Sequence, residues 1–260
     1  MIDAHIHLEQ YSSESLEQLL CELPSLGIEA LVAVSINLDS CLRTQKLAAT
    51  YPGFVHSAYG FHPEQPLPQE GELAALLKWI GSQSPEDYMA VGEIGLPYYS
   101  RAKALQRGEP WDMTPYIQLL DELLQLAARL YKPVILHAVY EDALLACDLL
   151  EKHGIQQAHF HWFKGPDEAI DRMIKNGYYI SFTPDIVYES EIQELARRYP
   201  VELVMAETDG PWPFEGPFAG RMTHPSMIRD VAAAWGVLHG YTSGEAEEIL
   251  TANTKRFYNL

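Results

Sequence analysis

The feature that most constrains the fold is a repeating pattern along the whole chain. A short apolar or β-branched run is followed by a polar turn and then by a segment with helical periodicity, such as Ser15–Leu26 or Thr114–Tyr131. Alternating strands and helices predict a parallel sheet, and eight repeats fit a closed α/β TIM barrel, (β/α)8. The predicted strands are Met1–Leu8, Ala30–Asn37, Phe54–Pro63, Tyr88–Leu96, Pro133–Val139, Ala158–Phe163, Tyr178–Thr183 and Glu202–Glu207.

We expect residues 1–260 to form a single barrel domain. No low-complexity tract or linker divides the chain, and 47% hydrophobic residues can supply a sizeable core. An open doubly wound sheet is the alternative architecture. It is disfavoured because no GxGxxG motif follows the first predicted strand.

Composition and charge indicate where the protein is located and which partners it can bind. The first residues lack the basic and apolar stretches of a secretory signal, and no apolar run approaches the roughly 18 residues of a membrane span. The three cysteines form no CxxC pair, so a cytoplasmic protein without membrane attachment is predicted. The net charge of -18 disfavours an extended duplex-binding surface, but it is compatible with a small anionic substrate beside bound cations.

Imidazoles and carboxylates occur at the ends of the predicted strands. His5 and His7 end the first strand, and residues at i and i+2 of a strand share a face. Because active sites of such barrels form at the carboxyl ends of the strands, these side chains are expected to converge at one mouth. A metal would supply the partners that buried polar groups need. The other candidate ligands are His62, Glu93, His137, His161 and Asp209.

This set is larger than one tetrahedral ion needs, so two divalent ions are predicted. Mixed imidazole and carboxylate ligands suit zinc, iron or manganese, whereas carboxylates alone would suit magnesium better. Two ions about 3.5–4 Å apart typically share a bridging hydroxide that attacks a phosphoryl or acyl centre.

Further polar residues have open roles. His159 and Glu207 precede His161 and Asp209 by two residues, so they lie deeper on the same faces. His159 is expected to be a core residue or to orient a ligand. Glu207 either orients a ligand or forms an ion pair inside the barrel.

Two stretches, Ser100–Met113 and Gly210–Gly220, follow strand ends and are interpreted as insertions, either substrate lids or rigid surface loops. Substrate contacts are predicted for Lys164, as an anion-binding residue, and for aromatic side chains that could stack on a planar group. These aromatic candidates are Tyr98, Tyr99 and Trp212.

The chain resembles the TatD-like metal-dependent hydrolases within the wider amidohydrolase-type barrels. The resemblance covers nearly the whole length. It rests on seven ordered segments: Ile2–His7, Gly60–Pro63, Gly92–Leu96, Pro133–His137, His161–Gly165, Glu207–Pro211 and Asn253–Phe257.

The resemblance implies that His5, His7, Glu93 and Asp209 hold one ion. Glu93 would also bridge to a second ion, which His137 and His161 hold. Asp209 would take the proton from the nucleophilic water, and His62 would lie just outside the ligands, near the phosphate or leaving group.

The implied activity is phosphodiester hydrolysis, of the deoxyribonuclease or nucleotide phosphoesterase type, on nucleic-acid ends or small nucleotides. There are three departures from the family pattern: Pro97 replaces an acidic residue, Val139 stands where an Arg is usual, and Trp162 and Lys164 replace small residues. Pro97, the missing Arg and the acidic surface favour an alternative, hydrolysis of an amide, ester or lactone at the same site. A catalytically silent metal-binding protein is a third interpretation, disfavoured because every expected ligand is present.

Overall fold

The computed structural model describes residues 1–260, and its eight strands form one parallel sheet in the order of the sequence. All eight predicted strands are present, so the TIM barrel is confirmed. Each strand is shorter than predicted, because the last residues of each predicted run leave the ladder and turn over the rim of the barrel. The strands are β1 Ile2–Ile6, β2 Ala30–Ala33, β3 Val55–Tyr59, β4 Ala90–Gly95, β5 Val134–His137, β6 Ala158–Phe160, β7 Tyr179–Phe182 and β8 Val204–Ala206.

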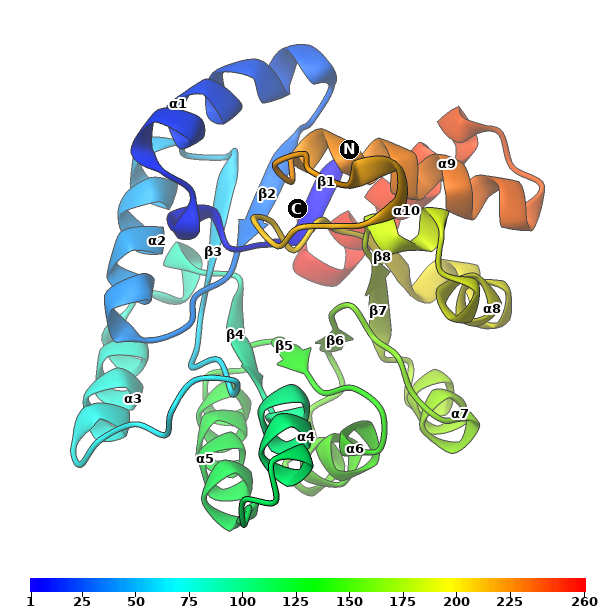
Figure 1. Cartoon of the computed structure of the whole chain (residues 1–260). Helices are drawn as coiled ribbons and strands as arrows, with labels where there is room; N and C mark the ends of the chain where they lie inside the picture. The colour runs from blue at the N-terminus through cyan, green and yellow to red at the C-terminus, as the bar shows by residue number, and fades with distance from the viewer.

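Helices surround the strands as an outer ring (Figure 1). Their amphipathic faces pack on the sheet; in α5, for example, Leu119, Leu123 and Leu126 are buried. None of the helices is both long enough and apolar enough to cross a membrane. The helices are α1 Ser13–Glu22, α2 Leu38–Thr50, α3 Glu72–Ser82, α4 Tyr98–Gln106, α5 Thr114–Arg129, α6 Asp142–Lys152, α7 Asp167–Asn176, α8 Ser190–Arg198, α9 Ile228–His239 and α10 Ser243–Tyr258.

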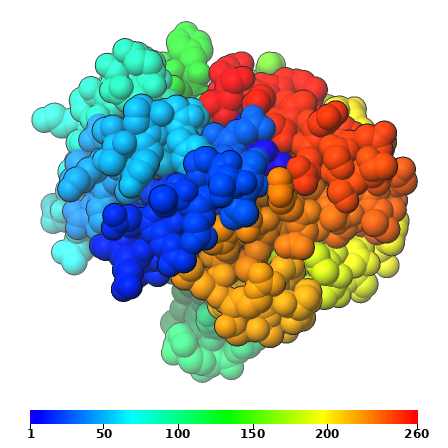
Figure 2. Space-filling view, turned by 90° about the horizontal axis from the view of Figure 1, so that it is seen from above, coloured from blue at the N-terminus to red at the C-terminus, as the bar shows by residue number.

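The first and last strands meet at their carboxyl ends. The backbone N–H of Asp209 donates to the carbonyl of His5 (3.0 Å), and that of His7 donates to Gly210 (2.8 Å). In Figure 2 the blue N-terminal segment lies beside the orange segment that follows β8, and the Tyr11 hydroxyl donates to the carbonyl of Thr223 (2.9 Å). These contacts bring residues from the two ends of the barrel sequence to one rim.

The two predicted insertions are ordered segments on this rim. Half of Ser100–Met113, the residues up to Gln106, belongs to α4, so the expectation of a loop is wrong there. Arg101 of α4 pairs with Asp142 (2.7 Å) at the start of α6, which anchors this helix to its neighbour. In the second stretch Phe214 and Phe218 are buried, whereas Trp212 is 58% exposed.

Candidate metal centre

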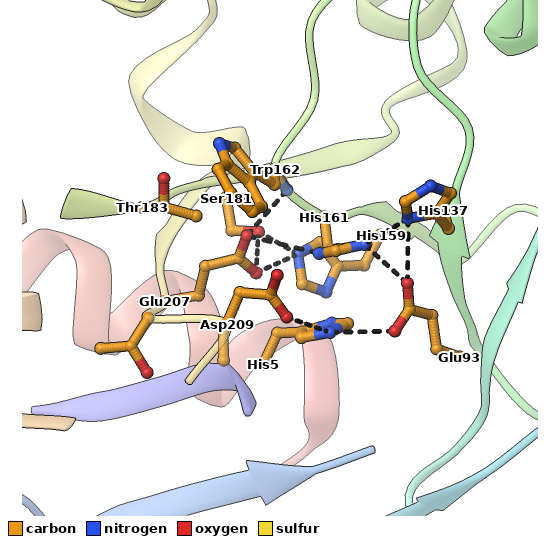
Figure 3. A network of polar contacts seen from close by, with 12 residues as sticks. His5, Glu93, His137, His159, His161, Trp162, Ser181, Thr183, Glu207 and Asp209 are labelled. Atoms are coloured by element: carbon orange, nitrogen blue, oxygen red, sulfur yellow. Dashed lines mark hydrogen bonds and ion pairs between the residues drawn. The ribbon is translucent and has the colours of Figure 1, made fainter. Parts of the chain in front are cut away.

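The predicted ligands converge at the carboxyl ends of the strands. His5 and Glu93 lie within β1 and β4 and His137 ends β5, whereas the remaining four lie one to three residues after strand ends. Figure 3 shows the side chains of His5, Glu93, His137, His161 and Asp209 pointing toward one another. All seven are buried or nearly so. The four that follow strand ends are His7, His62, His161 and Asp209.

Glu93 lies at the centre, and its two oxygens face different neighbours. Oε2 lies 3.2 Å from Nε2 of His5 and 3.0 Å from Nε2 of His7. Oε1 lies 2.8 Å from Nε2 of His161 and 3.2 Å from Nδ1 of His137. One carboxylate therefore joins two groups of imidazoles.

Asp209 completes the first group and His62 joins the second. Oδ1 of Asp209 lies 3.3 Å from Nε2 of His5 and 3.4 Å from Nε2 of His7. Nε2 of His62 lies 3.2 Å from Oε1 of Glu93, the same distance as Nδ1 of His137. The structure thus brings His62 among the ligand candidates, where the resemblance implied a place just outside them.

Several polar atoms of this cluster have no hydrogen-bond partners. Both oxygens of Glu93, Oδ1 of Asp209 and both ring nitrogens of His5 are buried without one. Their close contacts are not aligned as hydrogen bonds. Ligand bonds of about 2.0–2.2 Å to one ion place ligand atoms about 3.0–3.5 Å apart, close to most of the separations observed. Shared divalent cations would satisfy these atoms, so the side chains present fit divalent metal binding.

The charge state agrees with this interpretation. Burial opposes ionisation of Glu93, but the surrounding histidines, His62 foremost, hold the pKa of its carboxyl well below its usual range. Burial likewise opposes ionisation of Asp209, and the contact with His5 lowers the pKa of that carboxyl. Both carboxylates are therefore ionised in the folded chain, as metal ligands must be.

Two glycines allow the strands to approach closely at Glu93. A Cβ on Gly60 would lie 2.4 Å from the backbone oxygen of Glu93, and one on Gly95 would lie 1.9 Å from that of His137. No side chain fits at either position. The Gly-Glu-Ile-Gly segment of β4 therefore carries the carboxylate against the neighbouring strand.

Three residues at the mouth have left-handed backbone conformations. They are Tyr140 (φ 52°), Trp162 (φ 39°) and Asp209 (φ 50°), each directly after a strand or within a few residues of it. For residues other than glycine this conformation costs on the order of 1–3 kcal/mol, and such strain clusters at functional sites. The three strained residues therefore lie on the same rim as the polar cluster.

The two residues with open roles lie below the cluster. His159 is buried, with Nδ1 3.0 Å from the hydroxyl of Tyr258 and Nε2 2.5 Å from that of Ser181. It is thus a satisfied core histidine. Glu207 lies with Oε1 3.6 Å from Nδ1 of His161, which favours the role of orienting that ring.

Sequence reasoning missed Glu64. Its Oε1 lies 3.3 Å from Nε2 of His137, and its carboxylate accepts hydrogen bonds from the backbone of Tyr99 and Ser100. Burial opposes ionisation, but the contacts with His137 and Ser100 lower the pKa of Glu64 to about 2. The only sequence signal was its place two residues after His62.

The proposed substrate residues lie around the mouth, and the cation among them is paired. Nζ of Lys164 lies 3.5 Å from Oδ2 of Asp185 and 5.6 Å from the centre of the Trp162 ring. Trp212 contacts Trp162 edge to face at 6.0 Å. Tyr98 stacks at a tilt on Tyr140, with ring centres 4.6 Å apart. Lys164 and Tyr98 thus have protein partners, whereas the indole of Trp212 is largely free.

Comparison with known proteins decides the family. The sequence profile of the family described as TatD related DNase matches residues 2–259. The chain belongs to the TatD family. The resemblance seen in the sequence is thereby confirmed, and so is the prediction of a metal-dependent hydrolase, at the level of the family.

Individual TatD relatives match over all or nearly all of their length. A Haemophilus influenzae protein named uncharacterized metal-dependent hydrolase is 35% identical over 260 residues, which is 100% of both chains. The human Deoxyribonuclease TATDN3 is 28% identical and covers 99% of this chain and 94% of its own. The crystal structure of YJJV, a TatD homolog from Escherichia coli, aligns with a TM-score of 0.86 at 26% identity and covers 100% of this chain and 98% of that one.

Proposed function

We propose that this TatD family member binds two divalent ions and hydrolyses phosphodiester bonds. The observation that carries the proposal is the position of Glu93, whose two oxygens face separate groups of ligands. His5, His7 and Asp209 would hold one ion, and His137 and His161 the other. Zinc, manganese and iron suit the imidazoles, and magnesium remains compatible with the carboxylates.

When bound, such ions supply a water nucleophile at neutral pH and neutralise charge on a phosphoryl group. The protein side chains would supply the base and the contacts with the substrate. Asp209 is ionised and lies at the rim, so it would accept the proton of the attacking water. His62 is 17% exposed beside Glu93, where it can contact a phosphate oxygen or leaving group. The intact ligand set argues against a catalytically silent protein.

The proposed substrates are nucleic-acid ends or small nucleotides. The deoxyribonuclease name of the human relative supports phosphodiester chemistry. The net charge of -18 argues against an extended duplex surface, so a short end reaching the ions is favoured. The exposed indole of Trp212 offers a face for a base to stack on. We further propose a cytoplasmic location.

Hydrolysis of an amide, ester or lactone at the same ions is the second candidate. One observation favours it: the cations near the mouth are paired with protein carboxylates. Lys164 faces Asp185 at 3.5 Å and Arg101 contacts Asp142 at 2.7 Å, so neither is free to bind a phosphate. A substrate with less charge would need neither residue.

A substrate panel separates the two candidates. The purified protein is loaded with zinc, manganese or magnesium and tested on bis(p-nitrophenyl) phosphate, p-nitrophenyl phosphate, a p-nitrophenyl ester, an anilide and a lactone. Preferred cleavage of the diester, abolished by chelator, supports the proposal. Cleavage of carboxylic esters, amides or lactones alone would overturn it in favour of the second candidate.

A further inference from the structure

The carboxylate of Glu64 joins the start of α4 to the metal centre. It reaches the rim from the segment between β3 and α3. Oε1 accepts a hydrogen bond from the backbone N–H of Tyr99 (2.8 Å), and Oε2 accepts one from Ser100 (2.7 Å). Oε1 also lies 3.3 Å from Nε2 of His137. One side chain, 17% exposed, thus serves a helix terminus and an imidazole at once.

Helix α4 has no cap of its own. The residue before it is Pro97, which offers no side-chain acceptor to the free N–H groups of the first turn. An anionic acceptor stabilises such a helix start, because it satisfies these donors and lies at the positive end of the helix dipole. Glu64 supplies it from a distance of 35 residues in sequence.

The two nitrogens of His137 face opposite ways. Nδ1 lies 3.2 Å from Oε1 of Glu93 and 3.2 Å from Nε2 of His161, within the ligand cluster. Nε2 faces Glu64 on the other side. An ionised carboxylate can only accept, so it keeps the ring proton on Nε2 and leaves the lone pair of Nδ1 free for an ion. Carboxylates placed in this way also fix the plane of a ligand ring.

The same imidazole contacts the first turn of α4 directly. The ring of Tyr99 lies 5.9 Å from that of His137, edge to face. The helix start and the ligand therefore share both a carboxylate and a ring contact. Glu64 therefore links His137 to the amides of Tyr99 and Ser100.

We propose that Glu64 is a positioning residue, which fixes the tautomer and orientation of His137 and couples the start of α4 to metal occupancy. This inference rests on the proposed metal site and is independent of the proposed substrate. It assigns to α4 a role as a structural sensor of the metal, in place of the substrate lid considered from the sequence.

The test compares Glu64→Gln with Glu245→Gln in the full-length chain. Glu245 is a matched control, because its carboxylate also accepts from a backbone N–H at a helix start, that of Thr242 (2.8 Å), without a histidine contact. Metal-free protein is titrated with Co²⁺, and binding and the visible absorption spectrum are recorded. Hydrogen exchange is then measured in the peptide that contains Tyr99 and Ser100, with and without the ion.

In Glu64→Gln we expect one Co²⁺ site, the one that His137 holds, to lose about 10- to 100-fold in affinity, with an altered spectrum. Glu245→Gln should match the wild type. Co²⁺ should slow exchange at the start of α4 in the wild type and in the control, and not in Glu64→Gln. Wild-type affinity and spectrum in Glu64→Gln would overturn the inference, even if the variant melts at a lower temperature.

Two other outcomes are distinguishable. A wild-type chain that binds no Co²⁺, Zn²⁺ or Mn²⁺ would refute the metal site and this inference together. Normal metal binding without phosphodiester cleavage would refute only the proposed substrate. The inference itself is decided by metal affinity, spectrum and hydrogen exchange, without a turnover measurement.

Discussion

Oε1 of Glu207 lies 3.6 Å from Nδ1 of His161, and the same oxygen accepts a 2.7 Å hydrogen bond from the backbone N–H of Trp162. Oε2 accepts from the hydroxyl of Ser181 at 2.5 Å. Glu207 is thus held both by the strand beside it and by the residue that follows the histidine it faces. The backbone N–H of Trp162 therefore helps to hold the carboxylate that faces His161.

Replacing Glu207 by Gln should weaken metal binding about 10- to 100-fold without unfolding the barrel, because the ring of His161 loses its anionic partner. Metal titration followed by isothermal calorimetry measures the effect, and far-ultraviolet circular dichroism checks the fold. Glu202→Gln, at an exposed position outside the site, serves as the control. Equal affinity in the Glu207 variant would show that the charge of Glu207 does not orient His161.

Replacing Glu93 by Ala should abolish binding at both positions, because its oxygens serve both groups of ligands. A ligand at 100 times its Kd raises the unfolding free energy by about 2.7 kcal/mol. The wild type should therefore melt at a higher temperature with Zn²⁺ than with chelator, and Glu93→Ala should melt alike in both. A zinc-dependent shift of wild-type size in the variant would contradict the central position of Glu93.

Asp209→Asn should lower turnover about 10²- to 10⁴-fold, the usual contribution of a positioned base. An amide cannot accept the proton, although it can still occupy the same space. Initial rates are compared on whichever substrate the panel identifies, at saturating metal. Asp230→Asn, exposed on α9, should keep full activity. Unchanged rates in Asp209→Asn would remove this residue as the base.

Binding to duplex DNA should be weak at every ionic strength, because the net charge of -18 repels a polyanion. A short single-stranded end should bind through the ions and the exposed indole of Trp212, so Trp212→Ala should raise KM more than it lowers kcat. Fluorescence anisotropy with labelled oligonucleotides between low and moderate salt measures the binding, and initial rates give KM and kcat. Tight duplex binding with a steep salt dependence would contradict it.

Tyr258→Phe should destabilise the protein by about 1–3 kcal/mol, because it leaves Nδ1 of the buried His159 without a partner. Urea unfolding monitored by circular dichroism gives the difference. Tyr131→Phe is the control, since Tyr131 is 93% exposed and its hydroxyl is hydrated in the folded state. An equal midpoint for both variants would show that a water replaces the lost hydroxyl.

The sequence predicted the barrel and the converging ligands because both depend on position within a repeating unit. Side chains near the carboxyl ends of parallel strands meet whatever the details of packing, so His5, Glu93 and His137 could be grouped from their places in the repeat. The predicted strands extend beyond the carboxyl ends of the observed strands. Residues such as His161 continue an apolar run in sequence, although the backbone has already left the ladder.

Contacts between loops could not be predicted in this way. Glu64 contacts Tyr99 and His137 only because two rim segments fold toward each other. The periodicity of the sequence does not predict such a contact. The stretch Ser100–Met113, which α4 overlaps, was interpreted as an insertion and not as a helix, and the nine residues of α4 follow a proline. Its start depends on a carboxylate from elsewhere, which local sequence does not contain.

The closure of the rim by His5 and Asp209 has a consequence for biosynthesis. Their backbones are hydrogen bonded at 3.0 Å, yet they are among the first and last site residues to leave the ribosome. A nascent chain that has not yet exposed Asp209 displays the histidines of β1 with no base and no completed rim. Hydrolytic activity can therefore begin only once β8 and the Asp209 that follows it have emerged.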